Sequence, residues 1–108
     1  MEQLVVTVTN TTFDSMIQSA SRPVIVDFWA AWCQPCLRVS PLLSALAQEQ
    51  PDTLTVAKVN VDEEPELARR FGIQSIPTII RFDGGKETQR VVGAWPKDQL
   101  MTRLGLPA

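Results

Sequence analysis

Short runs of β-branched and other apolar residues alternate along the chain with segments whose apolar positions recur every three or four residues. Residues 24–29 form the most apolar run, which is typical of a central strand buried on both faces. Residues 33–50 follow with helical spacing, and their expected core face consists of Val39, Leu42, Leu43 and Leu46. This alternation of strand and helix patterns favours an α/β sheet.

The remaining segments continue the alternation. Strand composition marks residues 3–9, 53–61, 78–82 and 87–92, and helical composition marks residues 10–20, 65–71 and 96–104. Asp83-Gly84-Gly85 predicts a hairpin between the last two strands. The predicted order is β-α-β-α-β-α-β-β-α. No linker or repeat interrupts it, so we expect a single domain over residues 1–108.

Charge and composition narrow the classes of partner. The formal net charge is −2, so neither nucleic acid nor an anionic membrane is the expected partner. No apolar run approaches the roughly 20 residues that a membrane-spanning helix needs. The N-terminus shows no basic segment followed by an apolar one, as a secretory signal would. We therefore expect a cytoplasmic protein.

The chain contains two cysteines, Cys33 and Cys36, and no histidine. The usual general base and the usual nitrogen ligand of metals are therefore missing, and redox chemistry of the pair becomes the leading hypothesis. A structural zinc site needs about four ligands, so we expect neither a metal nor a cofactor, although counting alone leaves open a metal shared by two chains. In the cytosol such a close pair is more often catalytic than structural.

The placement of the pair suggests different roles for the two thiols. Cys33 follows the apolar strand and begins the long helix, where unpaired N–H groups and the helix dipole favour its thiolate. Cys36 lies one turn later and can attack a mixed disulfide on Cys33, while Pro35 suits the first helical turn. The alternative, two ordinary buried thiols, fits this placement less well.

Asp27 interrupts the most apolar strand. Desolvation there should raise its pKa toward neutrality, which suits proton exchange with the resolving thiol. Lys58, in the middle of the next strand, can approach Asp27 and lower that pKa again. In the alternative interpretation, Asp27 only accepts hydrogen bonds from backbone donors at the strand end.

Four segments of the chain match the motifs of one known family: residues 26–36 (VDFWAAWCQPC), 58–62 (KVNVD), 71–78 (FGIQSIPT) and 92–94 (VGA). With these motifs the chain resembles the thioredoxin family, and the resemblance runs nearly end to end. The resemblance implies the thioredoxin fold, a central five-stranded mixed sheet in the order 1-3-2-4-5 flanked by four helices. It also implies reduction of protein disulfides, with a thioredoxin reductase as the electron donor.

The same resemblance implies roles for individual residues. Cys33 would be the nucleophile, Cys36 the resolving thiol, Asp27 the proton-transfer group and Lys58 the residue that tunes it. Pro77 would follow a cis peptide bond, whereas about 95% of X–Pro bonds in folded proteins are trans. The apolar surface that docks substrate would consist of Trp32, Ile76, Pro77, Gly93 and Ala94.

The chain departs from the family's usual pattern at three positions. Gln34 replaces the glycine after the first cysteine; with Pro35 it should influence the redox poise of the pair, in a direction that the sequence leaves open. Leu37 replaces a common basic residue. Trp95 is either a packing residue at a helix start or an enlarged rim of the docking surface.

Three functions follow from these features. The leading hypothesis is a reductase that transfers electrons to protein disulfides through a mixed disulfide on a reversible Cys33–Cys36 pair. The Gln34 departure leaves open a disulfide oxidant or isomerase. A third possibility is a binding subunit of a partner enzyme, in which the thiols are incidental. We expect the chain to be a monomer.

Overall fold

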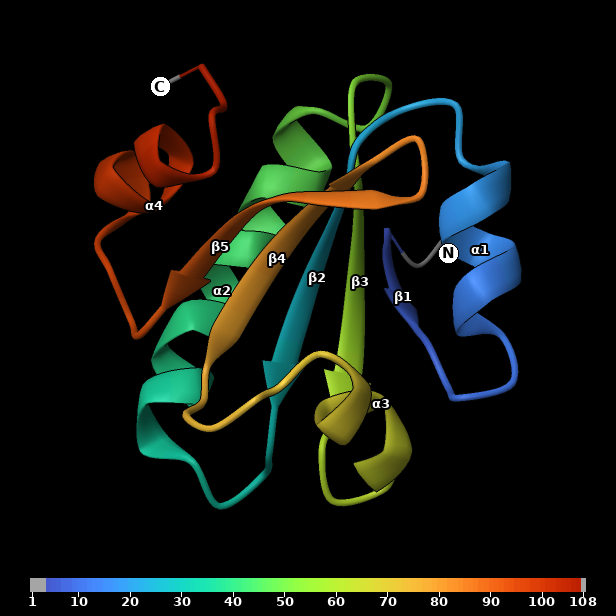
Figure 1. Ribbon diagram of the computed structural model, residues 1–108. Coiled ribbons are helices and arrows are strands. Elements are labelled where there is room, and N and C mark those ends of the chain that lie inside the picture. The colour runs from blue at the N-terminus through green and yellow to red at the C-terminus, as the bar shows by residue number, and fades with distance from the viewer. Residues whose placement is uncertain (1–3, 108) are drawn as a thin grey trace.

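The computed structural model describes residues 4–107 (Figure 1). Its five strands are β1 (Val5–Thr7), β2 (Val24–Trp29), β3 (Thr55–Asn60), β4 (Thr78–Asp83) and β5 (Lys86–Val92). Its four helices are α1 (Phe13–Ser19), α2 (Gln34–Glu49), α3 (Pro65–Arg70) and α4 (Lys97–Arg103). The predicted order of elements is confirmed.

The strands form one sheet in the order β1-β3-β2-β4-β5, as the resemblance implied. β1, β3 and β2 are parallel, whereas β4 runs antiparallel to both β2 and β5. The apolar run at residues 24–29 is the middle strand, and its first five residues are buried. The sequence pattern thus identified the centre of the sheet correctly.

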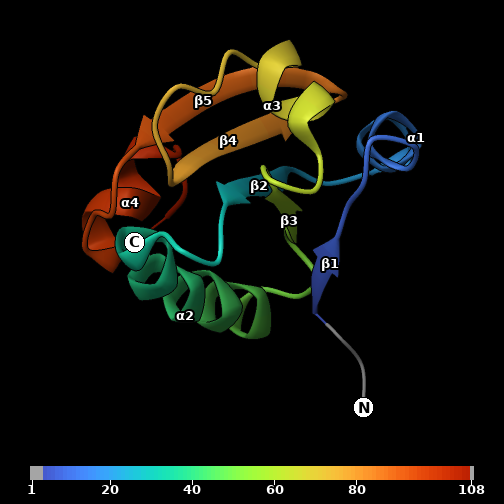
Figure 2. The ribbon, with the colours of Figure 1, turned by 90° about the horizontal axis from the view of Figure 1, so that it is seen from below.

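Helices cover both faces of the sheet, with α2 and α4 on one face and α1 and α3 on the other (Figure 2). Each face carries its own apolar cluster, one including Ile25, Leu43 and Leu100, and the other including Phe13 and Phe28. Among residues 4–107, no helix is both long enough and apolar enough to cross a membrane.

The prediction for the core face of α2 was wrong at Leu42. The buried positions of this helix are Cys36, Val39, Leu43, Leu46 and Ala47, and Leu42 is only half-buried. Successive helical residues are about 100° apart, so a stripe centred on Leu43 places Leu42 at its edge.

Several elements are shorter than predicted. Residue 3 lies outside the described residues, and β1 covers only Val5–Thr7 of the predicted 3–9. Thr9 turns the chain out of the sheet, because its N–H bonds to the Thr12 hydroxyl at 3.0 Å. In the last hairpin only Gly84 and Gly85 form the turn, with φ of 59° and 82°, a conformation that glycine adopts readily.

Candidate active site

The cysteine pair lies where β2 passes into α2 (Figure 1). Cys33 caps the helix instead of belonging to it, and its sulfur accepts a hydrogen bond of 3.2 Å from the Cys36 N–H. Cys33 and Cys36 form a disulfide with their Cα atoms 5.2 Å apart. Pro35 occupies the first turn, where a missing N–H breaks no helical hydrogen bond. Both cysteines are buried, with exposed fractions of 4% for Cys33 and 1% for Cys36.

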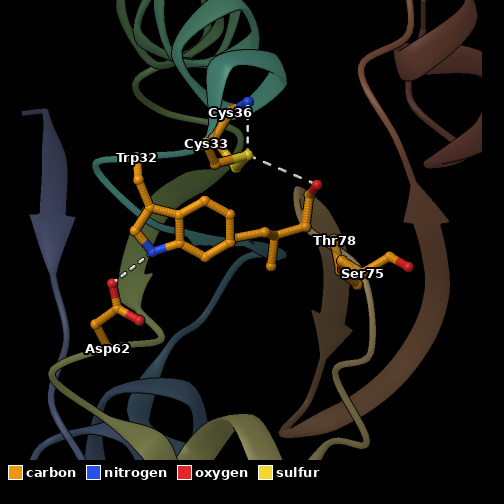
Figure 3. Close-up of a disulfide and its surroundings, with 7 residues drawn as sticks. Trp32, Cys33, Cys36, Asp62, Ser75 and Thr78 are labelled. Carbon is orange, nitrogen blue, oxygen red and sulfur yellow. Dashed lines mark hydrogen bonds between the residues drawn. A yellow bond between two sulfur atoms is a disulfide. The ribbon is translucent and has the colours of Figure 1, made fainter.

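The loop before β4 brings a second segment to the disulfide. The Ile76–Pro77 bond is cis, as the resemblance implied. The carbonyl oxygen of Ile76 lies 3.7 Å from Cys33 Sγ (Figure 3). The Gly93 N–H donates to the Pro77 carbonyl at 2.9 Å, which adds the end of β5 to the same region. Segments more than 40 residues apart in sequence thus meet at Cys33.

Most of the predicted docking residues reach the surface. Trp32 is 68% exposed and Ala94 is exposed, whereas Ile76 and Gly93 are half-buried and Pro77 is buried. The expectation that Trp32 is at least partly exposed is therefore confirmed.

A hydrogen bond orients the Trp32 side chain. Its indole N–H donates to a carboxylate oxygen of Asp62 at 2.8 Å (Figure 3). Reasoning from the sequence did not single out Asp62 as a site residue. Its only signal was its place at the end of the matching segment 58–62.

Asp27 lies on β2 with no exposed surface. Neither carboxylate oxygen has a hydrogen-bond partner among the described residues. The alternative interpretation, that Asp27 accepts hydrogen bonds from backbone donors, is therefore wrong. Burial raises the pKa of Asp27 to about 7, and the positive charge of Lys58 opposes that rise. A group with this pKa can both accept and release a proton near neutral pH.

Lys58 is the β3 residue in register with Asp27. Its ammonium donates to the Ser40 hydroxyl at 2.7 Å and lies 4.5 Å from the centroid of the Trp29 ring. Among the ion pairs of residues 4–107, none joins Lys58 to Asp27. Sequence reasoning missed Ser40, although a polar residue four positions after Cys36, on the buried side of α2, was a usable signal.

The three departures from the family pattern lie in different surroundings. Gln34 is exposed in the first turn of α2, and Leu37 is exposed one turn later. Trp95 is half-buried against an apolar cluster, and its indole N–H donates to the Val92 carbonyl at 2.9 Å. The Arg103 guanidinium lies 3.7 Å from the centroid of the Trp95 ring. These contacts support the packing interpretation of Trp95.

The arrangement suits two-electron exchange between a dithiol and a disulfide, with a buried proton acceptor on the strand that precedes the pair. In the part of the chain that the structure describes, no three potential metal ligands among His, Cys, Asp and Glu are grouped closely enough to hold an ion.

Comparison with known proteins gives a consistent result. The thioredoxin family model matches residues 4–105. The thioredoxin of Alicyclobacillus acidocaldarius is 49% identical over 98 residues, which cover 91% of this chain and 92% of that protein. The thioredoxin of Mycobacterium bovis is 47% identical over 97 residues, or 90% of this chain and 84% of that protein. The bifunctional thioredoxin reductase/thioredoxin of Mycobacterium leprae is 50% identical over 97 residues, but these cover only 21% of its length.

The buried carboxyl predicts a distinctive dependence of stability on pH. The pKa of Asp27 is about 7 in the folded protein, against an ordinary 3.8. Between these values the unfolded state ionises Asp27 while the folded state does not, so raising the pH favours unfolding. The wild type should lose about 4 kcal/mol of unfolding free energy between pH 4 and pH 8 that the Asp27→Asn variant keeps. Urea denaturation of both oxidised proteins at a series of pH values measures the two unfolding free energies. If the wild type and Asp27→Asn showed the same change in unfolding free energy between pH 4 and pH 8, the prediction would be contradicted.

Proposed function

The chain belongs to the thioredoxin family and is a thiol-disulfide oxidoreductase that reduces protein disulfides, and we propose that Cys33 is its nucleophile, Cys36 its resolving thiol and Asp27 its proton acceptor. One observation carries the proposal. The two cysteines pair at the start of α2, and the strand that leads to them holds a buried carboxyl that has no hydrogen-bond partner within residues 4–107.

In the first half of the reaction, the Cys33 thiolate attacks a sulfur of the substrate disulfide. A bond forms between Cys33 and that sulfur, the substrate S–S bond breaks, and the other substrate sulfur leaves as a thiolate. Two features support Cys33 as the attacking group. It keeps more exposed surface than Cys36, and the Cys36 N–H at the helix start donates to its sulfur, which stabilises negative charge there.

In the second half, Cys36 gives its proton to the Asp27 carboxylate and attacks the Cys33 sulfur. The Cys33–Cys36 disulfide forms and the second substrate thiolate leaves, so two electrons have passed from the protein to the substrate. The proton on Asp27 then passes to the solvent or to the departing thiolate. A pKa near 7 suits both the gain and the loss of this proton, and we assign Lys58 the tuning of it.

We assign substrate docking to Trp32, Ile76, Gly93 and Ala94. The Ile76 carbonyl next to Cys33 can accept a hydrogen bond from an extended substrate segment, while the exposed Trp32 indole offers apolar area. Pro77 is buried, so its proposed role is to hold the main chain of Ile76 toward Cys33 without touching substrate. Gln34 and Pro35, between the cysteines, are assigned the tuning of the reduction potential.

Partners and compartment follow from the same chemistry. After each turnover the disulfide must be reduced again, and we propose a thioredoxin reductase as the electron donor. The relative from M. leprae, whose name joins a thioredoxin reductase with a thioredoxin, supports this assignment. We further propose that residues 1–108 act as one monomeric domain in the reducing cytoplasm, with disulfide-containing proteins as substrates.

The assignment of the two thiols predicts opposite behaviour in two variants. The reduced Cys36→Ser variant should accumulate a covalent complex with native, disulfide-bonded insulin, because a serine hydroxyl does not displace the substrate from Cys33. Cys33→Ser should form no such complex. Intact mass spectrometry under non-reducing conditions measures both. A complex in the Cys33→Ser variant alone would show that Cys36 is the nucleophile and Cys33 the resolving thiol.

The docking surface predicts an effect that depends on substrate size. Trp32→Ala should raise KM for a protein disulfide about tenfold, because only a large substrate covers the indole. The KM for a small aromatic disulfide should change far less. Leu4→Ala is the matched control, since Leu4 is also an exposed apolar residue but precedes the edge strand β1. An equal effect of Trp32→Ala on both substrates would contradict a docking role.

A further inference from the structure

Ser40 contacts Lys58, although the reaction steps described above assign no role to Ser40. It lies in α2 one turn after Cys36, and its hydroxyl accepts a hydrogen bond from the Lys58 ammonium at 2.7 Å. Lys58 also lies over the Trp29 ring, 4.5 Å from its centroid. Two anchors, a hydroxyl from the helix and a ring from β2, therefore hold the ammonium in one place.

The position of the ammonium matters because the buried Asp27 carboxyl, of opposite charge when ionised, is also within reach of Lys58. Asp27 and Lys58 are register partners on neighbouring parallel strands, so both side chains leave the sheet on the same face, the one that α2 covers. Neighbouring strands are about 4.8 Å apart, which is within reach of a lysine side chain. Even so, the Asp27 oxygens have no hydrogen-bond partner among the described residues. The ammonium is directed to Ser40 and Trp29 instead of the buried carboxylate.

We propose that Ser40 is a positioning residue, whose hydroxyl holds the Lys58 ammonium away from Asp27 and so prevents an ion pair between Lys58 and Asp27. Released from Ser40, the ammonium would pair with the carboxylate, because a buried carboxylate without a partner is the strongest attraction within its reach. The consequence for catalysis rests on the proton-accepting role proposed above for Asp27. The positioning itself does not.

The other groups around Asp27 leave Lys58 as the charge that Ser40 controls. β4 places the apolar Ile79 in register with Asp27. Cys33, which caps α2, and Cys36 in its first turn form a disulfide, so neither sulfur carries a proton. β3 contributes Lys58. A titration of the oxidised protein therefore reports the position of the Lys58 charge with no contribution from the thiols.

The test is to titrate the Asp27 carboxyl in the oxidised protein and in its variants, with carbon-13 NMR of the Asp27 side chain as the readout. Ser40→Ala should weaken proton binding at Asp27 about tenfold, because the freed ammonium stabilises the ionised form. Lys58→Met should strengthen proton binding. The double variant should titrate like Lys58→Met alone, because Ser40 acts only through Lys58.

Two further variants separate positioning from a general packing effect. Ser40→Thr keeps the hydroxyl and should titrate like the wild type. Ser44→Ala, one turn later in α2 and also half-buried, should leave the titration unchanged. The inference is overturned if Asp27 in Ser40→Ala binds its proton as tightly as in the wild type, or more tightly. It is also overturned if Ser40→Ala weakens proton binding at Asp27 by the same factor when Lys58 has been replaced by Met. If Ser40→Ala weakens proton binding at Asp27 but leaves the rate of mixed-disulfide resolution unchanged, the result would support the positioning role of Ser40 and count against the catalytic role of Asp27.

Discussion

This site is organised around the carboxyl group of Asp27, which lies in the most buried strand of the sheet and has no hydrogen-bond partner in the part of the chain that the structure describes. Ionising Asp27 there destabilises the fold, since neither oxygen has a hydrogen-bond donor among the described residues to replace water. The apolar clusters on both faces of the sheet offset that cost. In return, burial gives Asp27 a pKa near neutral pH, so that it can accept and release a proton there. Residues with strongly shifted pKa values concentrate at functional sites.

The remaining features of the site follow from the path of the chain around this strand. A short connection, residues 30–32, joins β2 to the cap of α2, so residues 27–36 hold the proton acceptor and both sulfurs. The loop before β4 adds the Ile76 carbonyl next to Cys33, and the end of β5 joins it through the Gly93–Pro77 hydrogen bond. Three segments of the chain therefore bring the reactive, proton-accepting and docking groups to one end of the sheet.

Features determined by local pattern could be predicted from the sequence, and features determined by distant contacts could not. Periodicity located the central strand and the long helix, and a charge in an apolar run singled out Asp27. Motif resemblance was needed for the cis bond at Pro77, because nothing local distinguishes it from a trans bond. Ser40 and Asp62 were missed because their partners, Lys58 and Trp32, are 18 and 30 residues away in the chain. Leu42 was misplaced because a two-turn pattern does not define the edge of a buried stripe.

The proposed mechanism requires Asp27 to take the proton from the resolving thiol. The decisive measurement is the rate, as a function of pH, at which Cys36 resolves a preformed mixed disulfide on Cys33 in single-turnover experiments. The rate in the wild type should rise with pH around a midpoint near 7, where the carboxyl becomes able to accept a proton. In Asp27→Asn the rate should be lower at neutral pH and that midpoint should be missing. The same rate and the same pH profile in both proteins would remove Asp27 from the mechanism.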